Sequence, residues 1–383
     1  MNQPRRIRVF VLIDALGWSF LEGRDFLSDL LTYRTPLRTV LGFSSGAIPT
    51  ILTGLPPSRN GHWNLFYYDP ERSPFRWLRS FHFLPNAIMN HRIMRKLLTE
   101  TGRHLLGLGR NFDCCVSPRL LPWFNWVEKR SVYEVGGISG APSIFDQLAE
   151  RGIPFRVYSY HHWTDREILN LAQRDIVESN AGFFFVYLSE MDLLLHNHWR
   201  NPSTLDERLR WYESRLRDLF RRARELDSNA TMSVFSDHGM TPVEHHFDLV
   251  KEVEGLGFRM PSDYLAVYDS TMARFWFFND RARSATLERL ATLPCGRVIP
   301  DDEQEQLGIR FPDRRYGEAI FLMHPRWMMA SSDFNGRGWM PAGMHGYHPD
   351  DPYSDAIYLS SQPPSFPVRT IADVYQCMRE GVL

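Results

Sequence analysis

Three apolar segments of the chain each end in an acidic residue, and this recurrence is the strongest constraint on the fold. The segments are IRVFVLIDA (7–15), GFFFVYLSEMD (182–192) and TMSVFSDHG (231–239), and their acids are Asp14, Asp192 and Asp237. Near-continuous apolar runs of this length are typical of strands that are covered on both faces. Ligands gather at the carboxyl ends of the strands in doubly wound sheets, so we expect the three acids to share a site.

Helical patterns lie between several apolar segments, and this alternation predicts a layered α/β sandwich. The clearest helix covers 204–226, where leucines recur at helical spacing, and another covers 368–382. Further strands are expected at 155–161, 273–278, 318–324 and 355–361. With 383 residues, the chain is long enough for one large α/β domain with insertions, or for two domains.

Residues 66–138 differ from the rest of the chain and predict an insertion or cap. Strand signals fade there, and aromatic residues crowd in: Phe75, Trp77, Phe81, Phe83, Phe112, Trp123, Phe124 and Trp126. Between 71 and 130 there are 11 Lys and Arg residues against 4 Asp and Glu residues. Two interpretations are open. The insertion is a solvated basic face over packed aromatics, or it is a substrate lid whose rings hold a base or acyl chain and whose cations meet phosphates.

The composition argues against three classes of protein: binders of duplex nucleic acid, proteins built on disulfides or cysteine zinc sites, and membrane-spanning proteins. The hydrophobic fraction is 43%, which supports a large core, and the net charge is −1, so no chain-wide attraction to duplex nucleic acid is expected. The 4 cysteines form no C-x-x-C pair, which disfavours a disulfide framework or a cysteine zinc site and fits a reducing compartment. No apolar run reaches the length of a membrane span. We therefore expect a cytoplasmic protein; its oligomeric state is not indicated.

Histidines accompany the acids and complete a candidate metal site. His196 follows Asp192 by four residues, which is about one helical turn, and His238 is adjacent to Asp237. A late glycine-rich loop, GMHGYHP, adds His345. Six ligands of mixed nitrogen and oxygen type suit two divalent cations with three ligands each. This donor set favours Zn²⁺, with Mn²⁺ or Fe as alternatives.

The segment FSSGAIPTILTG (43–54) supplies a candidate nucleophile. Ser44 could cap a helix, which is the commoner role for a serine in this position. It could also be a nucleophile. In that case a bound metal ion would activate its hydroxyl, and Ser44 would itself be a metal ligand. The six candidate ligands favour the second interpretation, and Ser45 remains the alternative nucleophile.

These motifs, in this order, resemble the alkaline phosphatase superfamily, and within it the type I phosphodiesterase/nucleotide pyrophosphatase group. The resemblance rests on Asp14, the serine segment closed by Thr53-Gly54, D-x-x-x-H (192–196), DHGM (237–240) and HGY (345–347). It implies one catalytic domain over residues 1–383. This domain is expected to be a three-layer sandwich around a mostly parallel sheet, with 66–138 as an inserted cap. It also implies a phosphodiester hydrolase that forms a covalent phosphoseryl intermediate.

The resemblance also assigns roles to individual residues. In the family the nucleophile lies nine residues before the threonine of the closing Thr-Gly, which places it at Ser44. Asp14, Asp237 and His238 match the ligands of the metal that activates the nucleophile, and Asp192, His196 and His345 match those of the second metal. Asn64 matches an asparagine that donates to the phosphoryl oxygen, although the spacing to the following YDP is one residue off and Asn60 replaces the family's histidine before Gly61.

Several alternatives stay open at this stage. His198 competes with His196, while His161, His162, His245, His246 and His348 are additional histidines with no assigned role. A phosphoethanolamine-type phosphotransferase, a phosphomonoesterase and a catalytically inactive metal-binding module are the alternative functions. The sulfatase pattern of Pro and Arg after the nucleophile is absent from residues 44–48. The substrate, a small-molecule, lipid or glycan phosphodiester, is not specified by these motifs.

Overall fold

The computed structural model describes residues 5–81, 86–110, 112–114, 116–333, 336–337, 339–380 and 382. Its largest sheet has six strands in the order β2-β18-β7-β1-β6-β5. The strands are β2 (Tyr33–Leu37), β18 (Ala356–Ser360), β7 (Thr231–Phe235), β1 (Arg8–Ile13), β6 (Phe183–Leu188) and β5 (Phe155–Tyr158). All run parallel except β18, which is antiparallel to both its neighbours. The expected mostly parallel central sheet is therefore confirmed.

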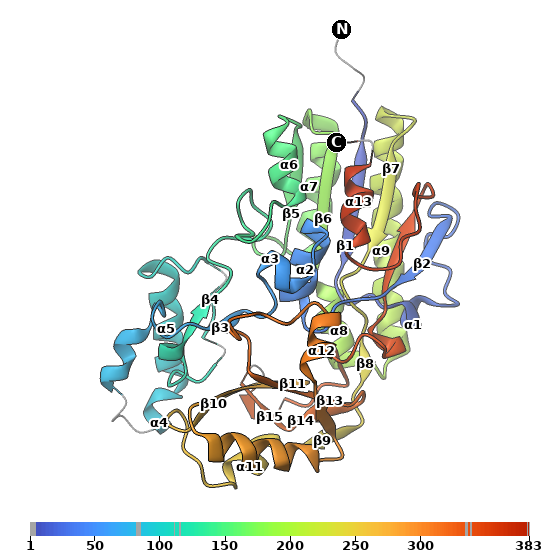
Figure 1. Cartoon of the computed structure of the whole chain (residues 1–383). Helices are drawn as coiled ribbons and strands as arrows, with labels where there is room; N and C mark the ends of the chain where they lie inside the picture. Colours follow the sequence, from blue (N-terminus) through green and yellow to red (C-terminus); the bar gives the residue numbers. More distant parts are fainter. Residues whose placement is uncertain are drawn as a thin grey trace.

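Helices cover both faces of this sheet and give three layers (Figure 1). One face carries α7 (Asp165–Glu178), α9 (Pro202–Leu226) and α1 (Trp18–Leu21). The other carries α2 (Ser44–Thr53), α6 (Ile144–Glu150) and α13 (Asp373–Arg379). The expected helix at 204–226 is α9, which begins two residues earlier.

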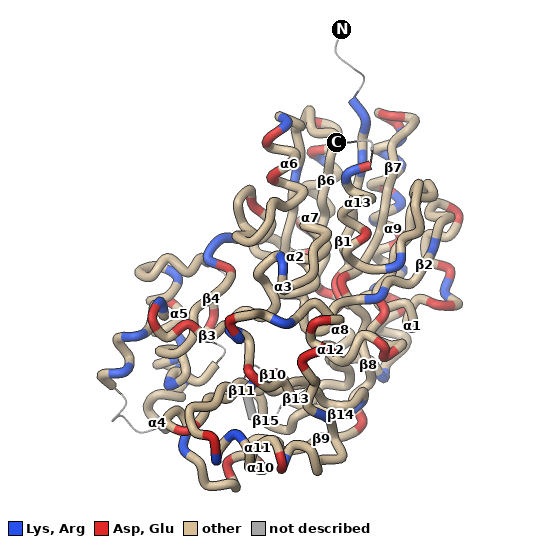
Figure 2. Tube along the Cα trace, viewed as in Figure 1, with Lys and Arg blue, Asp and Glu red and all other residues tan. Residues whose placement is uncertain are grey.

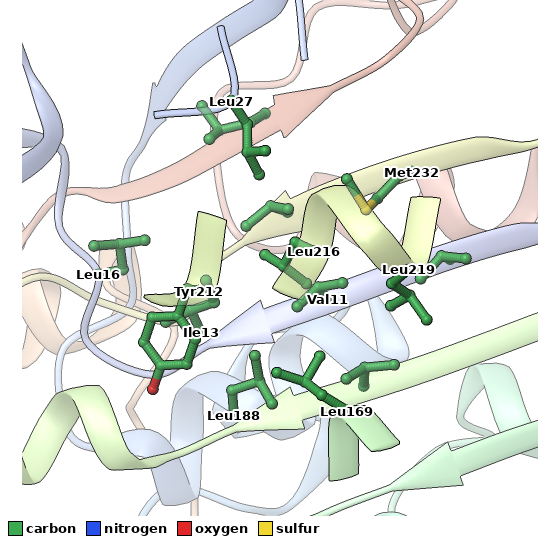
Figure 3. Close-up of a cluster of buried hydrophobic side chains, with 14 of the residues drawn as sticks. Val11, Ile13, Leu16, Leu27, Leu169, Leu188, Tyr212, Leu216, Leu219 and Met232 are labelled. Atoms are coloured by element: carbon green, nitrogen blue, oxygen red, sulfur yellow. The ribbon is translucent and has the colours of Figure 1, made fainter. Parts of the chain in front are cut away.

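The burial of strand β1 explains why its sequence is apolar from Val9 to Ile13. Val11 and Ile13 belong to the core beneath α7 and α9, together with Leu169 and Leu216, as Figure 3 shows. The alternate residue Leu12 belongs to the core on the opposite face. A strand whose side chains alternate between two buried layers must be apolar at every position.

A second, antiparallel sheet lies beyond the carboxyl edge of the first (Figure 1). Its strands are β10 (Tyr264–Asp269), β11 (Met272–Phe277), β13 (Ala319–Met323) and β12 (Gly296–Val298), in that order. The helices α10 (Leu249–Glu254), α11 (Asp280–Ala291) and α12 (Asp301–Gln306) accompany it. Two of the expected strands, at 273–278 and 318–324, belong to this sheet rather than to the central one.

Short elements connect these layers. They are α3 (Pro57–Asn60), α8 (Glu190–His198), β8 (Thr241–Pro242), β9 (His245–Phe247), β14 (Trp327–Met329), β15 (Ser331–Ser332), β16 (Gly336–Arg337), β17 (Gly343–Met344) and the 3₁₀ turn η3 (Pro352–Ser354). The pair β17 and β8 is important for function because His345 follows β17 directly.

Within the expected insertion 66–138, Val132, Tyr133 and Ile138 belong to the core of the central sheet. Residues 66–126 form a small subdomain beside the second sheet (Figure 1). It contains β3 (Phe66–Tyr68), η1 (Arg76–Phe81), α4 (Asn86–Met89), α5 (Arg92–His104), η2 (Leu121–Trp123) and β4 (Phe124–Trp126). Its aromatic residues form a core with Val267 and Trp276 of the second sheet. Phe83 and Cys115 lie outside the described residues. Helix α5 carries Arg and Lys residues and one acid, Glu100, and Figure 2 shows both blue and red positions on this helix.

The structure bears on the cysteines and on membrane-spanning helices. Cys114, Cys295 and Cys377 are buried and free. No helix within the described part of the chain combines the length and apolar character that crossing a bilayer requires.

Candidate active site

The strand ends bring the predicted acids together. β1 lies between β7 and β6 in a parallel register, with Ile13 opposite Leu188. Asp14 directly follows β1, Asp237 follows β7 after one residue, and Asp192 lies in the first turn of α8 after β6. Parallel neighbours in register end at the same edge, so the three carboxylates meet there.

The first of two ligand groups contains Asp14, Asp237 and His238. Their ligand atoms all lie within 4.8 Å of one another, and all three residues are buried. The Nε2 atom of His238 lies 3.2 Å from Asp237 Oδ2 and 3.7 Å from Asp14 Oδ1.

The second ligand group contains Asp192, His196 and His345, again within 4.8 Å of one another. Asp192 and His196 lie one turn apart on α8, and the Nε2 atom of His196 is 3.3 Å from Asp192 Oδ1. His345 comes from the loop after β17, and its Nε2 atom is 3.6 Å from the same oxygen. The two groups adjoin because the rings of His238 and His345 stack with centroids 3.9 Å apart.

Both groups have the properties of cation sites. Asp14 Oδ1, Asp192 Oδ1 and Asp237 Oδ2 are buried and accept no hydrogen bond, although a buried carboxylate oxygen without a partner is costly. Burial, followed by the charges of Asp237 and Asp192, raises the pKa of Asp14 well above its usual range. A positive charge between these oxygens would offset both costs, so the donor set fits divalent cations.

The histidines are oriented for such a role. The Nδ1 atom of His196 lies 2.8 Å from the Gly343 carbonyl oxygen, and that of His238 lies 2.9 Å from the Gly239 carbonyl oxygen. A histidine whose Nδ1–H donates to a carbonyl keeps the lone pair on Nε2, which is the usual second contact of a metal-binding histidine. Burial, and then the nearby His238, lower the pKa of His345 well below its usual value, which keeps its ring neutral.

Ser44 stands beside the first group. It is the first residue of α2, but Phe43 occupies the N-cap position and no side chain caps the helix. The alternative role of Ser44 as a helix cap is therefore wrong. Its Oγ atom lies 3.0 Å from His238 Nε2 instead. The competing hydroxyl, Ser45 Oγ, donates to the Trp63 carbonyl oxygen at 3.2 Å.

Asn64 faces the same cavity as Ser44 and is buried. Its Nδ2 atom donates to Asp269 Oδ2 at 3.3 Å, and the same oxygen accepts a hydrogen bond from Arg274 Nε at 2.7 Å. An amide nitrogen carries two hydrogens, so Asn64 retains a second N–H for a ligand.

The six other histidines named from the sequence lie outside both ligand groups. His198 is exposed on α8, and His348 contacts Glu303 at 3.1 Å. His245 stacks near Trp327 on the second sheet's side of the molecule, next to His246 in β9. His161, in contrast, lines the cavity at Ser44, while its neighbour His162 does not.

The cavity beside Ser44 has a volume of about 310 Å³. Besides Ser44, Asn64 and the candidate ligands His196 and His345, its lining comprises Phe43, Ser45, Ile48, Leu65, Trp126, Glu128, Val132, Tyr133, Tyr160, His161, Tyr187, Ser270, Trp339 and Met344. The segment 66–138 thus contributes Trp126, Glu128, Val132 and Tyr133 to the cavity. Its lysines and arginines are not among the described lining residues, contrary to the lid hypothesis that cations of this segment meet substrate phosphates.

Sequence reasoning missed Tyr187, Glu128 and Tyr160. The Tyr187 hydroxyl donates to Asp14 Oδ2 and therefore holds one oxygen of that carboxylate, leaving the other toward the site. Tyr187 lies within the apolar run of β6, where it is indistinguishable from a core residue. The side chains of β6 alternate between the two faces of the sheet. The sequence signal for a role at the site is that Tyr187, an aromatic residue with a polar hydroxyl, stands one residue before the end of the strand.

The chain is similar to a known protein family and to solved structures. The family model described as type I phosphodiesterase / nucleotide pyrophosphatase matches residues 9–348. No curated protein sequence matches the chain significantly.

Among solved structures, human ectonucleotide pyrophosphatase/phosphodiesterase 5 (ENPP5) is similar with a TM-score of 0.70 at 12% identity, covering 98% of this chain and 95% of that one. Murine ENPP5, and its inactive variant in complex with AMP, are each similar with a TM-score of 0.68 at 14% identity over the same shares. At these identities the structures establish the fold, and the family model establishes the family. The chain belongs to the type I phosphodiesterase/nucleotide pyrophosphatase family, within the alkaline phosphatase superfamily, and is a phosphodiester hydrolase.

Proposed function

We propose that the chain hydrolyses phosphodiesters with Ser44 as the nucleophile and with two divalent cations held by the two ligand groups. The observation that carries this proposal is the 3.0 Å distance between Ser44 Oγ and His238 Nε2, in a site where His238 stacks on His345 of the second group. The nucleophile and both ligand groups thus meet at one edge of the central sheet.

The donor chemistry favours Zn²⁺, with Mn²⁺ and Fe as alternatives. Asp14, Asp237 and His238 would hold one cation, with Ser44 as a further ligand, and Asp192, His196 and His345 would hold the other. Cations at these positions would supply positive charge to the phosphoryl oxygens and favour the ionised form of a bound hydroxyl.

The residues of the chain carry the two chemical steps. Ser44 Oγ attacks phosphorus, its bond to phosphorus forms, and the bond to the departing alcohol oxygen breaks. The hydroxyl proton passes from Ser44 to solvent water, and the departing oxygen takes up a proton from solvent water as it becomes an alcohol. Water then hydrolyses the phosphoseryl bond, which restores Ser44 and releases a phosphomonoester. Asn64 donates its second amide hydrogen to a phosphoryl oxygen during both displacements.

The cavity supports a diester substrate over a monoester. A phosphomonoester dianion calls for additional positive charge, whereas no Lys or Arg occurs among the described lining residues. The AMP complex of the murine relative makes nucleotide esters one substrate class to test. The hydroxyl of Ser44 and all six candidate ligands are in place, which argues against an inactive metal-binding module.

The test is hydrolysis of bis(p-nitrophenyl) phosphate with and without a chelator. We expect activity that the chelator removes and that added Zn²⁺ or Mn²⁺ restores. Ser44→Ala should retain bound metal and lose at least about 10³-fold in kcat, because removal of a covalent nucleophile removes the whole displacement. Ser45→Ala is the matched control and should stay within about tenfold of the wild type. Normal turnover by Ser44→Ala would refute the nucleophile.

Supplying an acceptor alcohol separates hydrolysis from group transfer. A hydrolase yields the phosphomonoester in proportion to substrate consumed, whereas a phosphotransferase of the same superfamily yields mainly the new diester. Quantification of both products by phosphorus NMR gives the ratio directly.

A further inference from the structure

Helix α5 of the 66–126 subdomain lies at the outer edge of the molecule (Figure 1). The residues that face the subdomain core are Leu98, Thr99 and Gly102, which are all buried. A Cβ atom on Gly102 would lie 2.4 Å from the ring of Phe112, so the helix approaches this ring more closely than a residue with a side chain would allow. The opposite side of α5 therefore faces away from the core.

Apolar side chains occupy this outward side of α5. Ile93 and Leu97 lie one helical turn apart and are 67% and 58% exposed. Leu105, which follows the last residue of the helix, is 79% exposed. Single exposed leucines are common on protein surfaces, but aligned ones leave an apolar stripe that no part of the described chain covers. Such a stripe indicates an interaction surface.

A row of cations runs beside the apolar stripe. Arg92 precedes Ile93 and Lys96 precedes Leu97, so the two cations are also one turn apart. Both are exposed, and neither forms an ion pair with a residue that the structure describes. The surrounding segment, 71–130, has 11 Lys and Arg residues against 4 Asp and Glu residues, so the positive potential extends beyond these two side chains.

The single acid of α5, Glu100, is engaged by other groups. Its Oε1 atom lies 3.4 Å from Arg103 Nη1, and its Oε2 atom lies 3.2 Å from His104 Nε2. Arg103 is itself held in place, because its Nε donates to the Phe112 carbonyl oxygen at 2.7 Å. The outward side of α5 thus presents an apolar stripe and two unpaired cations, while its acid is compensated.

We propose that the outward side of α5 binds the surface of a bilayer that contains anionic lipids. Ile93 and Leu97 enter the boundary between head groups and acyl chains, and Arg92 and Lys96 meet the lipid phosphates. The helix lies in the plane of this boundary and does not cross the bilayer. The proposal concerns a surface outside the active site and is independent of the hydrolase function proposed above.

Two features favour a bilayer over a protein partner. Ile93 and Leu97 protrude from a convex helix, and a fluid lipid surface adapts to that shape without a preformed groove. A second copy of the chain on the same stripe would bring Arg92 and Lys96 close to their own counterparts, and like charges oppose such a contact.

Co-sedimentation of the full chain with vesicles tests the proposal without turnover. The probes are vesicles of phosphatidylcholine alone and vesicles of equal parts phosphatidylcholine and phosphatidylglycerol. We expect binding to the mixed vesicles to be at least about tenfold tighter, because each cation near an anionic surface contributes to the attraction. Raising NaCl from about 0.05 M to about 0.5 M should weaken this binding, since salt screens the attraction. Equal binding to both vesicles, binding to neither, or binding that is indifferent to salt would overturn the proposal.

Paired variants assign the binding to α5. Ile93→Ser with Leu97→Ser should weaken binding to the mixed vesicles by about tenfold or more, because it removes the apolar stripe. The matched control is Val177→Ser with Leu226→Ser, two apolar residues on other helices that are each 52% exposed. This control should bind like the wild type. Unchanged binding in the α5 variant, or an equal loss in the control, would contradict the assignment.

A second pair of variants separates charge from apolar contact. Arg92→Gln with Lys96→Gln should abolish the preference for anionic vesicles, and Arg210→Gln with Arg222→Gln, exposed cations of α9, should preserve it. All variants should hydrolyse soluble bis(p-nitrophenyl) phosphate like the wild type, which shows that they are folded. A preference that survives in the α5 charge variant would overturn the role of the two cations.

Sedimentation velocity without lipid examines the alternative occupant. We expect the wild type and the variant Ile93→Ser with Leu97→Ser to sediment alike. Self-association of the wild type that this variant abolishes would assign the stripe to a second copy of the chain and would overturn the bilayer proposal.

Discussion

Asn64 and Asp269 are joined by a hydrogen bond of 3.3 Å from the amide nitrogen to the carboxylate, across 205 positions of sequence. Asp269 ends β10 of the second sheet, and Asn64 precedes β3 of the 66–126 subdomain. The same carboxylate oxygen accepts from Arg274, whose Nη1 donates to the Phe66 carbonyl oxygen at 3.0 Å. A buried ion pair thus fixes an amide at the cavity where Ser44 lies.

Replacing Asn64 tests whether that amide acts on the substrate. We expect Asn64→Ala to lower kcat for an aryl phosphodiester by about 10²-fold, because it removes a preorganised donor to the phosphoryl oxygen. Bound metal, measured by elemental analysis, should be unchanged, since Asn64 belongs to neither ligand group. A kcat equal to that of the wild type would show that Asn64 is only structural.

Removing Asp269 tests the energetic weight of the buried pair. Both side chains of the Asp269–Arg274 pair are fully buried, so Asp269→Ala leaves an uncompensated charge. We expect a loss of about 3–5 kcal/mol in the free energy of unfolding, measured with urea.

An exposed ion pair supplies the control for that measurement. Glu244 and Arg326 lie 2.7 Å apart with side chains that are 42% and 44% exposed. Glu244→Ala should change stability by less than about 1 kcal/mol, because exposed pairs are well solvated. Equal losses for Asp269→Ala and Glu244→Ala would contradict the importance of burial.

The two histidines of α8 form a matched pair for metal binding. His196 is buried in the second ligand group, whereas His198, two residues on, is exposed. We expect His196→Ala to reduce the bound zinc from about two ions to about one per chain, because the second group would keep only two ligands. His198→Ala should bind zinc like the wild type. Loss of zinc in His198→Ala, or full occupancy in His196→Ala, would show that the ligand assignment is wrong.

Glu128 makes stability depend on pH. Burial raises its pKa to about 7 from 4.5, so the folded chain holds a proton there that the unfolded chain releases at lower pH. The protonated carboxyl of Glu128 therefore favours the folded chain, and this contribution to the free energy of unfolding is fully present below pH 4.5. It is lost as the pH rises to about 7 and the buried carboxyl ionises. Glu128→Gln lacks this titration. Its stability relative to the wild type should therefore rise between pH 5 and pH 8, by at most about 3 kcal/mol.

Denaturant titrations of both proteins at the two pH values check this prediction. The comparison uses the difference between variant and wild type, because titration of other groups is common to both proteins. A difference that is the same at pH 5 and pH 8 would mean that Glu128 is well solvated.

The central sheet and the convergence of the candidate ligands could be predicted from the sequence because their signals are local. An apolar run followed by an acid marks a strand end, and the shared edge of parallel strands then brings Asp14, Asp192 and Asp237 together. His196 follows from helical spacing. The order of the motifs, through the family resemblance, indicated His345 and Ser44.

The cavity wall and the second sheet could not be predicted in the same way. The apolar pattern of 273–278 indicates a strand but does not say which sheet it joins. Glu128 is one of many charged residues in a basic segment, and only the packing of that segment places it beside Tyr160. The contact between Asn64 and Asp269 depends on how two distant parts of the chain approach each other, which no local pattern specifies.

The most direct test of the account is a crystal structure of the zinc-loaded protein, with anomalous scattering recorded on either side of the zinc absorption edge. We expect two anomalous peaks about 4 Å apart. One should lie among Asp14, Asp237, His238 and Ser44, and the other among Asp192, His196 and His345. A structure without zinc at these side chains, or with a single ion elsewhere, would contradict it.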